Sequence, residues 1–223
     1  MEDNKKRNLM WTLILFGVFV IYTVCVKFVD VAPIGPEGSS VGFSGLNKAI
    51  HDLLGYNEFF YLISKILGLF AIMFMGMVAL IALWQVIQRK SLFKADRCYY
   101  VIGVFYVIVL IVYLFFEVCI INFRPVILDE GLEASYPSSH TVLAISVFLS
   151  GAIWFKRIIS REMKTFVPTI LYTFTFLMVV SRLISGVHWF TDIIGGVVGG
   201  AFLTSLYMTL VSYFENTDKQ KKD

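Results

Sequence analysis

Six long apolar runs constrain the fold of this chain more than any other feature of its sequence. They cover about residues 10–28, 59–87, 98–121, 140–155, 166–183 and 190–214. With 58% hydrophobic and only 16% charged residues, the chain has too little polar surface for a water-soluble protein. Backbone groups in lipid must be paired within their own segment, so each run is expected to be a helix. The sequence predicts an all-α polytopic membrane protein, a six-helix transmembrane bundle that forms a single domain over residues 1–223.

The basic residues predict how these helices cross the membrane, because cytoplasmic loops are rich in Lys and Arg. Of the 19 Lys and Arg residues, all but five fall on one side of the predicted bundle. This side receives Lys5, Lys6, Arg7, Arg89, Lys90, Lys94, Arg97, Lys156, Arg157, Arg161, Lys164, Lys219, Lys221 and Lys222. We therefore expect a cell-membrane protein with both termini in the cytoplasm. The run at Lys5–Arg7 is interpreted as an orientation signal beside the first span, so nucleic acid is not an expected partner.

With this orientation, four separate regions bring ionisable residues to the same outer face. These residues are Arg124, His140, Arg182, and His188 with Asp192. Ionisable groups at the edge of a bilayer are costly and are usually functional. His188 and Asp192 are four residues apart, which on a helix places them on one face, so the carboxylate could hold one imidazole nitrogen and leave the other free. The alternative is a pair that only ties two helix ends together.

The residue types at this face are suited to phosphate chemistry. Pro137 precedes Ser138 and Ser139, which are good N-cap residues for a helix that starts near His140, and a helix N-terminus can hold an anion. Two arginines add forked positive charges, while one histidine could attack phosphorus and the other could protonate the departing oxygen. No Cys or His cluster and no Walker-type loop is present, so no metal or cofactor is expected. Ser138 as nucleophile with His140 as its base is a weaker alternative, since no G-x-S-x-G turn occurs.

Two further segments carry structural predictions. The outer loop over residues 29–57 starts irregularly and then shows helical spacing at residues 46–54, which predicts a short helix in the membrane interface. His51 in that helix is expected to be a surface histidine, with a role in a lid as the alternative. The glycines of residues 195–200 indicate close helix packing, and a channel or transporter fits less well because the helices lack polar residues at mid-membrane.

Three short motifs carry a resemblance to a known family. Arg124-Pro125, then Pro137 to His140, then Ser181-Arg182 with His188 and Asp192 resemble the three-part signature of the type-2 phosphatidic acid phosphatase superfamily, which are integral membrane lipid phosphatases with six helices. The third motif matches in full. The second has Ser139 where the family usually has Gly, and the first has Glu117 where the family usually has Lys.

The resemblance implies a role for each matching residue. His188 would be the nucleophile that forms a phosphohistidine, Asp192 would orient it, and His140 would be the general acid. Substrate phosphate would be held by Arg124 and Arg182, with Ser138, Ser139 and the neighbouring backbone assisting.

Glu117 and Lys65 are the uncertain positions. Glu117 could pair with one of the arginines or turn away from the site. Lys65, near the outer end of the second span, could supply the lost positive charge, although a lysine that snorkels to the interface is the plainer interpretation.

The resemblance also implies a substrate class, namely a lipid phosphate or pyrophosphate in the outer leaflet. The leading candidate is polyprenyl (undecaprenyl) pyrophosphate, recycled for the cell envelope, followed by phosphatidylglycerophosphate and phosphatidic acid. Because a pyrophosphate needs more positive charge than a monophosphate, Glu117 argues for a monoester. The alternative from another class is a protein of the same fold that binds or transports lipid phosphates without hydrolysis.

Overall fold

The computed structural model describes residues 2–91, 94–128, 131–158 and 160–214. Over these ranges the chain forms seven α-helices and one short 3-10 turn at Pro36–Gly38. The α-helices are α1 (Glu2–Phe28), α2 (Ser44–Leu54), α3 (Glu58–Arg89), α4 (Arg97–Val118), α5 (Ser139–Ile158), α6 (Met163–Ser185) and α7 (Phe190–Phe214).

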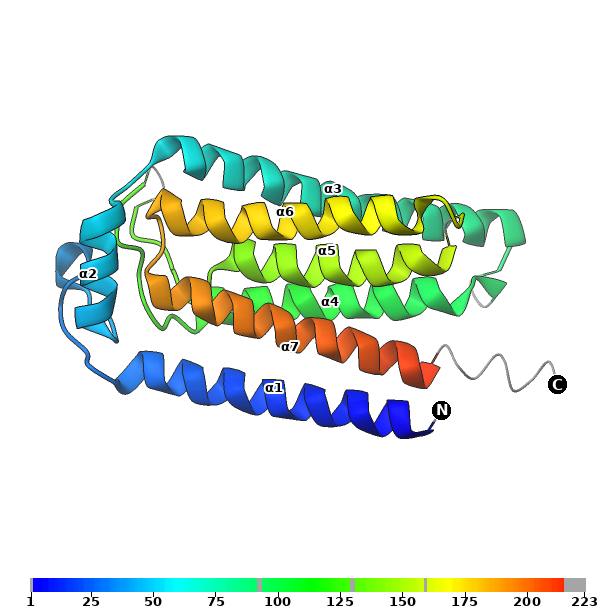
Figure 1. Cartoon of the computed structure of the whole chain (residues 1–223), viewed down its shortest axis with the longest axis horizontal. Coiled ribbons are helices and arrows are strands. Elements are labelled where there is room, and N and C mark those ends of the chain that lie inside the picture. Colours follow the sequence, from blue (N-terminus) through cyan, green and yellow to red (C-terminus); the bar gives the residue numbers. More distant parts are fainter. Residues whose placement is uncertain (1, 92–93, 129–130, 159, 215–223) are drawn as a thin grey trace.

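Six of these helices, all except α2, are long and apolar enough to cross a membrane, which confirms the predicted six-helix transmembrane bundle. They run side by side along the long axis of the molecule, and α2 lies across one end (Figure 1). Large apolar side chains such as Leu13, Leu80 and Phe176 point outward, as lipid-facing side chains must. Helix α1 begins well before the predicted residue 10, so Lys5–Arg7 lie within it. The basic residues Lys219, Lys221 and Lys222 lie outside the described residues.

Helix α5 is the most buried of the six described spans, and it packs against α3, α4, α6 and α7. Its contact with α7 depends on small residues. A Cβ on Gly196 would lie 2.8 Å from Thr141 Cβ, and one on Gly200 would lie 2.6 Å from Ile145 Cβ. The helices approach this closely only because glycine has no side chain, which confirms the close packing predicted for residues 195–200.

The end of the bundle that carries α2 also collects the connecting loops. Helices α3, α5 and α7 start there and α1, α4 and α6 end there, whereas α1 begins and α7 ends at the opposite end (Figure 1). The short helix predicted near residues 46–54 is present as α2, and Asn47 of this helix bonds to α7. The Asn47 amide donates to Thr191 Oγ1 at 2.8 Å and accepts from the Thr191 N–H at 3.1 Å. The topology therefore gathers the predicted site residues at one end.

Candidate active site

His188 lies in the short turn between α6 and α7, with only 5% of its surface exposed. The turn starts at Gly186, whose φ of +65° suits glycine, and α7 starts at Phe190. The prediction that His188 and Asp192 share one helix face is therefore wrong, because only Asp192 belongs to α7. Two antiparallel spans need a chain reversal between them, and His188 is part of that reversal.

Ser135 connects His188 to Asp192. The Ser135 hydroxyl oxygen lies 2.9 Å from His188 Nδ1, and its O–H donates to Asp192 Oδ2 at 2.6 Å. Because the serine proton points to the carboxylate, the serine oxygen accepts from the imidazole, and Nδ1 carries the ring proton. Asp192 thus acts on His188 through an intervening hydroxyl group rather than by direct contact.

Asp192 is fully buried in the first turn of α7, and both of its carboxyl oxygens have further donors. Asn122 Nδ2 donates to Oδ1 at 3.1 Å, and the Trp189 backbone N–H donates to Oδ2 at 3.1 Å. Asn122 and Ser135 are themselves joined, since the Ser135 N–H donates to the Asn122 carbonyl at 2.9 Å. The loop between α4 and α5 therefore positions the carboxyl group from both sides.

Arg182 occupies the other side of the His188 ring. It is fully buried near the end of α6, where Nη1 donates to Ser64 Oγ at 3.1 Å and Nη2 contacts His188 Nε2. A guanidinium group can only donate, so Nε2 must be the accepting nitrogen. The contacts on both sides of the ring agree on one tautomer, in which Nε2 keeps its lone pair and faces a positive charge.

Electrostatics around His188 keep the imidazole neutral. Burial lowers its pKa well below the ordinary value, and the nearby positive charges of Arg182 and Arg124, together with His140, lower the pKa further. A neutral imidazole retains the lone pair that a nucleophile or a base requires. The arrangement can therefore present an imidazole nitrogen to an electrophile at neutral pH.

Two arginines offer buried donors at this site. Arg124 Nη2 forms an ion pair with Glu133 Oε2 at 2.8 Å, so its acidic partner is Glu133 and not Glu117. The Nε atoms of both Arg124 and Arg182 are buried and have no hydrogen-bond partner among the described residues. A buried donor without a partner costs free energy, so both positions favour the approach of an acceptor such as a phosphate oxygen.

Helix α5 starts at Ser139, directly beside this cluster. Ser138 precedes it as a fully buried residue whose N–H donates to the Asp192 carbonyl at 3.0 Å and whose Oγ accepts from Thr141 at 3.0 Å. These bonds use the Ser138 N–H and one lone pair of its hydroxyl oxygen, whereas Ser139 and His140 face an adjacent cavity. The first N–H groups of α5 have no intrahelical partners and remain suited to an anion.

The His140 ring packs against α3. A Cβ on Gly68 would lie 2.7 Å from His140 Cδ2 and 3.0 Å from Nε2, so only a glycine lets α3 pass the ring at this distance. The position of the second histidine is therefore determined by a residue from a helix that carries no recognisable motif.

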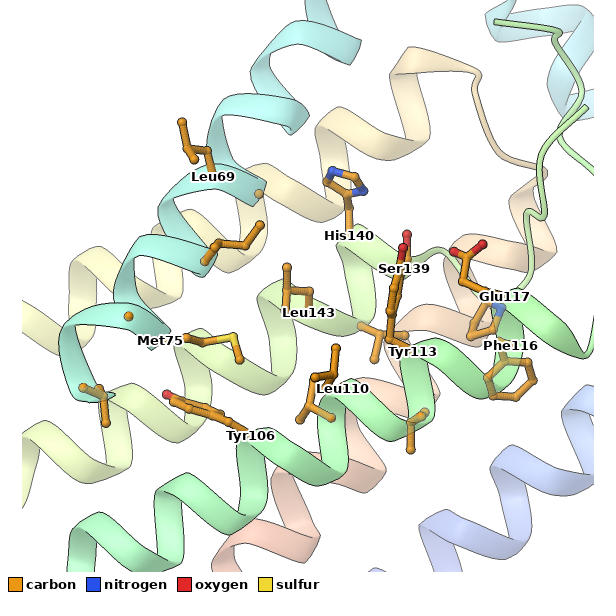
Figure 2. A pocket seen from close by; sticks show the side chains of 18 of the residues that line it. Leu69, Met75, Tyr106, Leu110, Tyr113, Phe116, Glu117, Ser139, His140 and Leu143 are labelled. Atoms are coloured by element: carbon orange, nitrogen blue, oxygen red, sulfur yellow. The ribbon is translucent and has the colours of Figure 1, made fainter. Parts of the chain in front are cut away.

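A cavity of about 860 Å³ extends from this cluster between α3, α4 and α5. Ser135 and His140 lie at one end, and Ala82 and Tyr99 lie deep along α3 and α4. Figure 2 shows Glu117 near Ser139 at the site end of the cavity and Tyr106 and Met75 farther along it. The uncertain residues Lys65 and Glu117 both line this cavity. From Lys65 to Ala82, α3 rises about 25 Å at ~1.5 Å per residue, most of the ~30 Å hydrocarbon core of a bilayer.

His51 differs from the expected surface histidine. It is half-buried on α2, its ring centroid lies 5.4 Å from that of Trp189, and its buried Nδ1 has no partner among the described residues. The Trp189 indole N–H in turn donates to the Phe123 carbonyl at 2.8 Å. The residue that follows His188 is therefore held between α2 and the loop from α4 to α5.

Sequence reasoning missed three residues that contact the site: Ser135, Asn122 and Glu133. They lie in the loop between α4 and α5, where Phe123 pairs with Ala134 as an antiparallel bridge. No motif includes them, and their proximity to Arg124 in the chain is the one signal that pointed to them. The bridge, which local sequence does not encode, is what brings both arms of the loop to Asp192 and Arg124.

Comparisons with known proteins support the fold. No curated protein sequence matches the chain. Among solved structures, the chain is similar to a transmembrane PAP2-type phosphatidylglycerolphosphate phosphatase from Bacillus subtilis, with 19% identity, a TM-score of 0.59, and coverage of 94% of this chain and 96% of that one. Aquifex aeolicus LpxE matches with 21% identity over 69% of this chain and 96% of its own, but its TM-score of 0.33 carries no weight.

The family scan covers the part of the chain that holds the site. Residues 116–216 match the model of the PAP2 superfamily, and this range includes all of the motif residues together with Ser135 and Asn122. The fold, shared with a transmembrane PAP2-type structure over nearly the whole chain, agrees with that match. The part of the chain that carries the two histidines, the two arginines and the buried carboxyl group is therefore similar to the PAP2 superfamily, and the whole chain shares the fold of a transmembrane PAP2-type structure.

Proposed function

We propose that this protein is a membrane lipid phosphatase that cleaves a lipid phosphate through a phosphohistidine on His188. The single observation that carries the proposal is the state of the His188 ring. Its Nδ1–H is held by Ser135, and its Nε2 lone pair is directed at Arg182 beside buried arginine donors. An in-line displacement at phosphorus requires a nucleophile, here a ring nitrogen, next to hydrogen-bond donors that hold the three phosphoryl oxygens.

In the proposed reaction, the phosphate of the lipid is held by Arg124, Arg182 and the first N–H groups of α5 near Ser139. Arg182 Nη2 passes from His188 Nε2 to a phosphate oxygen, which frees the Nε2 lone pair to attack phosphorus; the bond from phosphorus to the lipid oxygen breaks, and His140 donates a proton to that oxygen. Water then attacks the phosphohistidine with His140 taking its proton, which releases inorganic phosphate and restores the imidazole. Asp192, acting through Ser135, stabilises the positive charge that the ring gains when the P–N bond forms. No metal takes part in this scheme.

The cavity supports a lipid as the carrier of the phosphate. It starts at His140 and Ser135 and continues between α3 and α4 past residues such as Leu69, Met75 and Leu110. An apolar chain bound there would keep its phosphate at the site end. The B. subtilis neighbour is by its name a phosphatidylglycerolphosphate phosphatase, which supports a phospholipid monoester as substrate here. We further propose that the site end of the bundle faces away from the cytoplasm, in agreement with the basic residues at the opposite end.

The test is phosphate release by the purified protein in detergent, with EDTA present, from phosphatidylglycerophosphate, phosphatidic acid and a polyprenyl pyrophosphate. We expect release from at least one lipid, survival of that release in EDTA, and its loss in His188→Ala. Acid-labile labelling of the wild type by ³²P-lipid, absent in the variant, would identify the phosphohistidine. A folded wild type that binds these lipids but releases no phosphate would refute the phosphatase and support the non-hydrolytic binder.

A further inference from the structure

Glu117 stands where the catalytic cluster meets the apolar cavity. It lies in the last turn of α4 and lines the same cavity as His140 and Ser135, and Figure 2 shows its carboxyl group near Ser139. Ser135 is in direct contact with His188, so the cavity wall at Glu117 is continuous with the proposed phosphate site. A lipid with its phosphate at His188 and its chain in the cavity would therefore lie along a wall that includes this carboxyl group.

No basic side chain among the described residues neutralises Glu117 in an ion pair, and the polar neighbour of its carboxyl group is Tyr113, which also lines the cavity. Glu117 is exposed, and Arg124 pairs with Glu133 instead. Of the ionisable side chains that line the cavity, Lys65 on α3 has the opposite charge, and its ammonium group lies 5.2 Å from the centre of the Tyr61 ring. The cavity wall thus has no net formal charge from this pair, and the donors suited to a phosphate, on Arg124 and Arg182, lie in the buried cluster instead.

This distribution of charge discriminates between lipid classes. A carboxylate accepts hydrogen bonds and repels anions, so it favours a hydroxyl or ammonium group and disfavours a second phosphate. In a lipid pyrophosphate, the phosphate next to the chain would be the group that passes Glu117. In a phosphomonoester of a polar alcohol, a hydroxyl or ammonium group two or three atoms from the phosphate would pass it instead.

We propose that Glu117 is a specificity-determining residue that selects lipid phosphomonoesters whose alcohol carries a hydrogen-bond donor close to the phosphate, and that rejects lipid pyrophosphates. The proposal rests on the lipid phosphatase function above and names its substrate class. Glu117 touches the leaving alcohol and not the reacting phosphorus. Its removal therefore changes the choice of substrate more than the rate of the chemical step.

The experiment compares lipids that differ by one donor. A 1-acylglycerol 3-phosphate is assayed against its 2-deoxy analogue of equal chain length, with a sphingoid-base 1-phosphate as the ammonium-bearing probe and a polyprenyl pyrophosphate as the repelled probe. Both kcat/KM for phosphate release and the Kd for each lipid are measured for the wild type, Glu117→Ala and Glu117→Gln. Glu58→Gln is the matched control, because Glu58 is exposed in the first turn of α3 and does not line the cavity.

We expect the wild type to prefer the hydroxyl-bearing lipid over its deoxy analogue by about tenfold or more, the factor that one hydrogen bond to a charged group supplies. Glu117→Ala should bring that ratio close to one and raise the relative kcat/KM for the pyrophosphate, and Glu117→Gln should keep part of the hydroxyl preference and lose the ammonium preference. Glu58→Gln should behave as the wild type.

An unchanged lipid ratio in Glu117→Ala would overturn the specificity role, as would a wild type that prefers the pyrophosphate. These results are distinct from a failure of the phosphatase itself. That failure appears as no phosphate release from any lipid, and in that case the Kd ratios still decide whether Glu117 selects the donor-bearing lipid.

Discussion

The link through Ser135 makes a quantitative prediction for Ser135→Ala. The substitution removes the acceptor for the His188 Nδ1–H at 2.9 Å and the donor to Asp192 at 2.6 Å, all within a fully buried region. Hydrogen bonds that involve charged groups contribute about 1.5–3 kcal/mol, and each ~1.4 kcal/mol in the barrier is a factor of ten. The bond strengthens as the ring becomes positive, so we expect kcat to fall about 10- to 150-fold while KM changes little.

The assay is steady-state phosphate release together with rapid-quench formation of the phosphoenzyme. Ser146→Ala is the matched control, because the Ser146 hydroxyl in α5 is buried like that of Ser135 but has no partner among the described residues. It should leave kcat near the wild-type value. A kcat for Ser135→Ala that equals that of Ser146→Ala would refute the link.

A double-mutant cycle separates this link from a general loss of packing. If Asp192 acts through Ser135, then Asp192→Asn should cost much less in the Ser135→Ala background than in the wild type. Independent, additive costs would mean that the carboxyl group reaches His188 by another route, and the proposed path from Asp192 through Ser135 would be wrong.

Two other predictions concern the neighbouring histidines. Burial and the adjacent arginines lower the pKa of His188, so the ring stays neutral as the pH falls through the ordinary histidine range near 6.5. The acid limb of the kcat/KM profile against pH should therefore lie clearly below that value. An acid limb centred at 6.5 or above would contradict this prediction. Gly68→Val should lower kcat by about tenfold or more through displacement of the His140 ring, since a general acid contributes ~100-fold or more. Gly17→Val in α1, where a Cβ meets no atom within 4 Å and which does not line the cavity, is its control, and equal activity of the two variants would argue against the contact.

Local sequence was sufficient for the spans and for naming the ionisable residues that gather at one end of the bundle. Each span is a continuous apolar run, and lipid leaves a helix as the available solution for such a run. Counting spans was enough to predict that five residues converge, because the end of one span and the start of the next lie on the same side of the membrane. These residues are Arg124, His140, Arg182, His188 and Asp192. The structure bears out the gathering at one end, and their individual roles stand as proposals.

Other features depended on contacts between residues far apart in the chain. The spacing of His188 and Asp192 suggested a shared helix, yet the chain reverses at Gly186 and α7 starts after His188. The partner of Arg124 is Glu133, which an antiparallel bridge in the loop carries to it, while Glu117 faces the cavity instead.

The sequence by itself determined that this chain is a six-span helical bundle with a histidine and arginine cluster at one end. Each apolar run identifies one span, and counting the spans assigns each connecting loop to one end of the bundle. The tertiary structure alone decided which hydrogen bonds and packing contacts connect the residues of that cluster. Ser135 enters between Asp192 and His188, Gly68 admits the His140 ring, and Glu117 borders the cavity. Each of these is a contact between segments whose meeting depends on how the helices and one loop pack, and no local pattern encodes that distance.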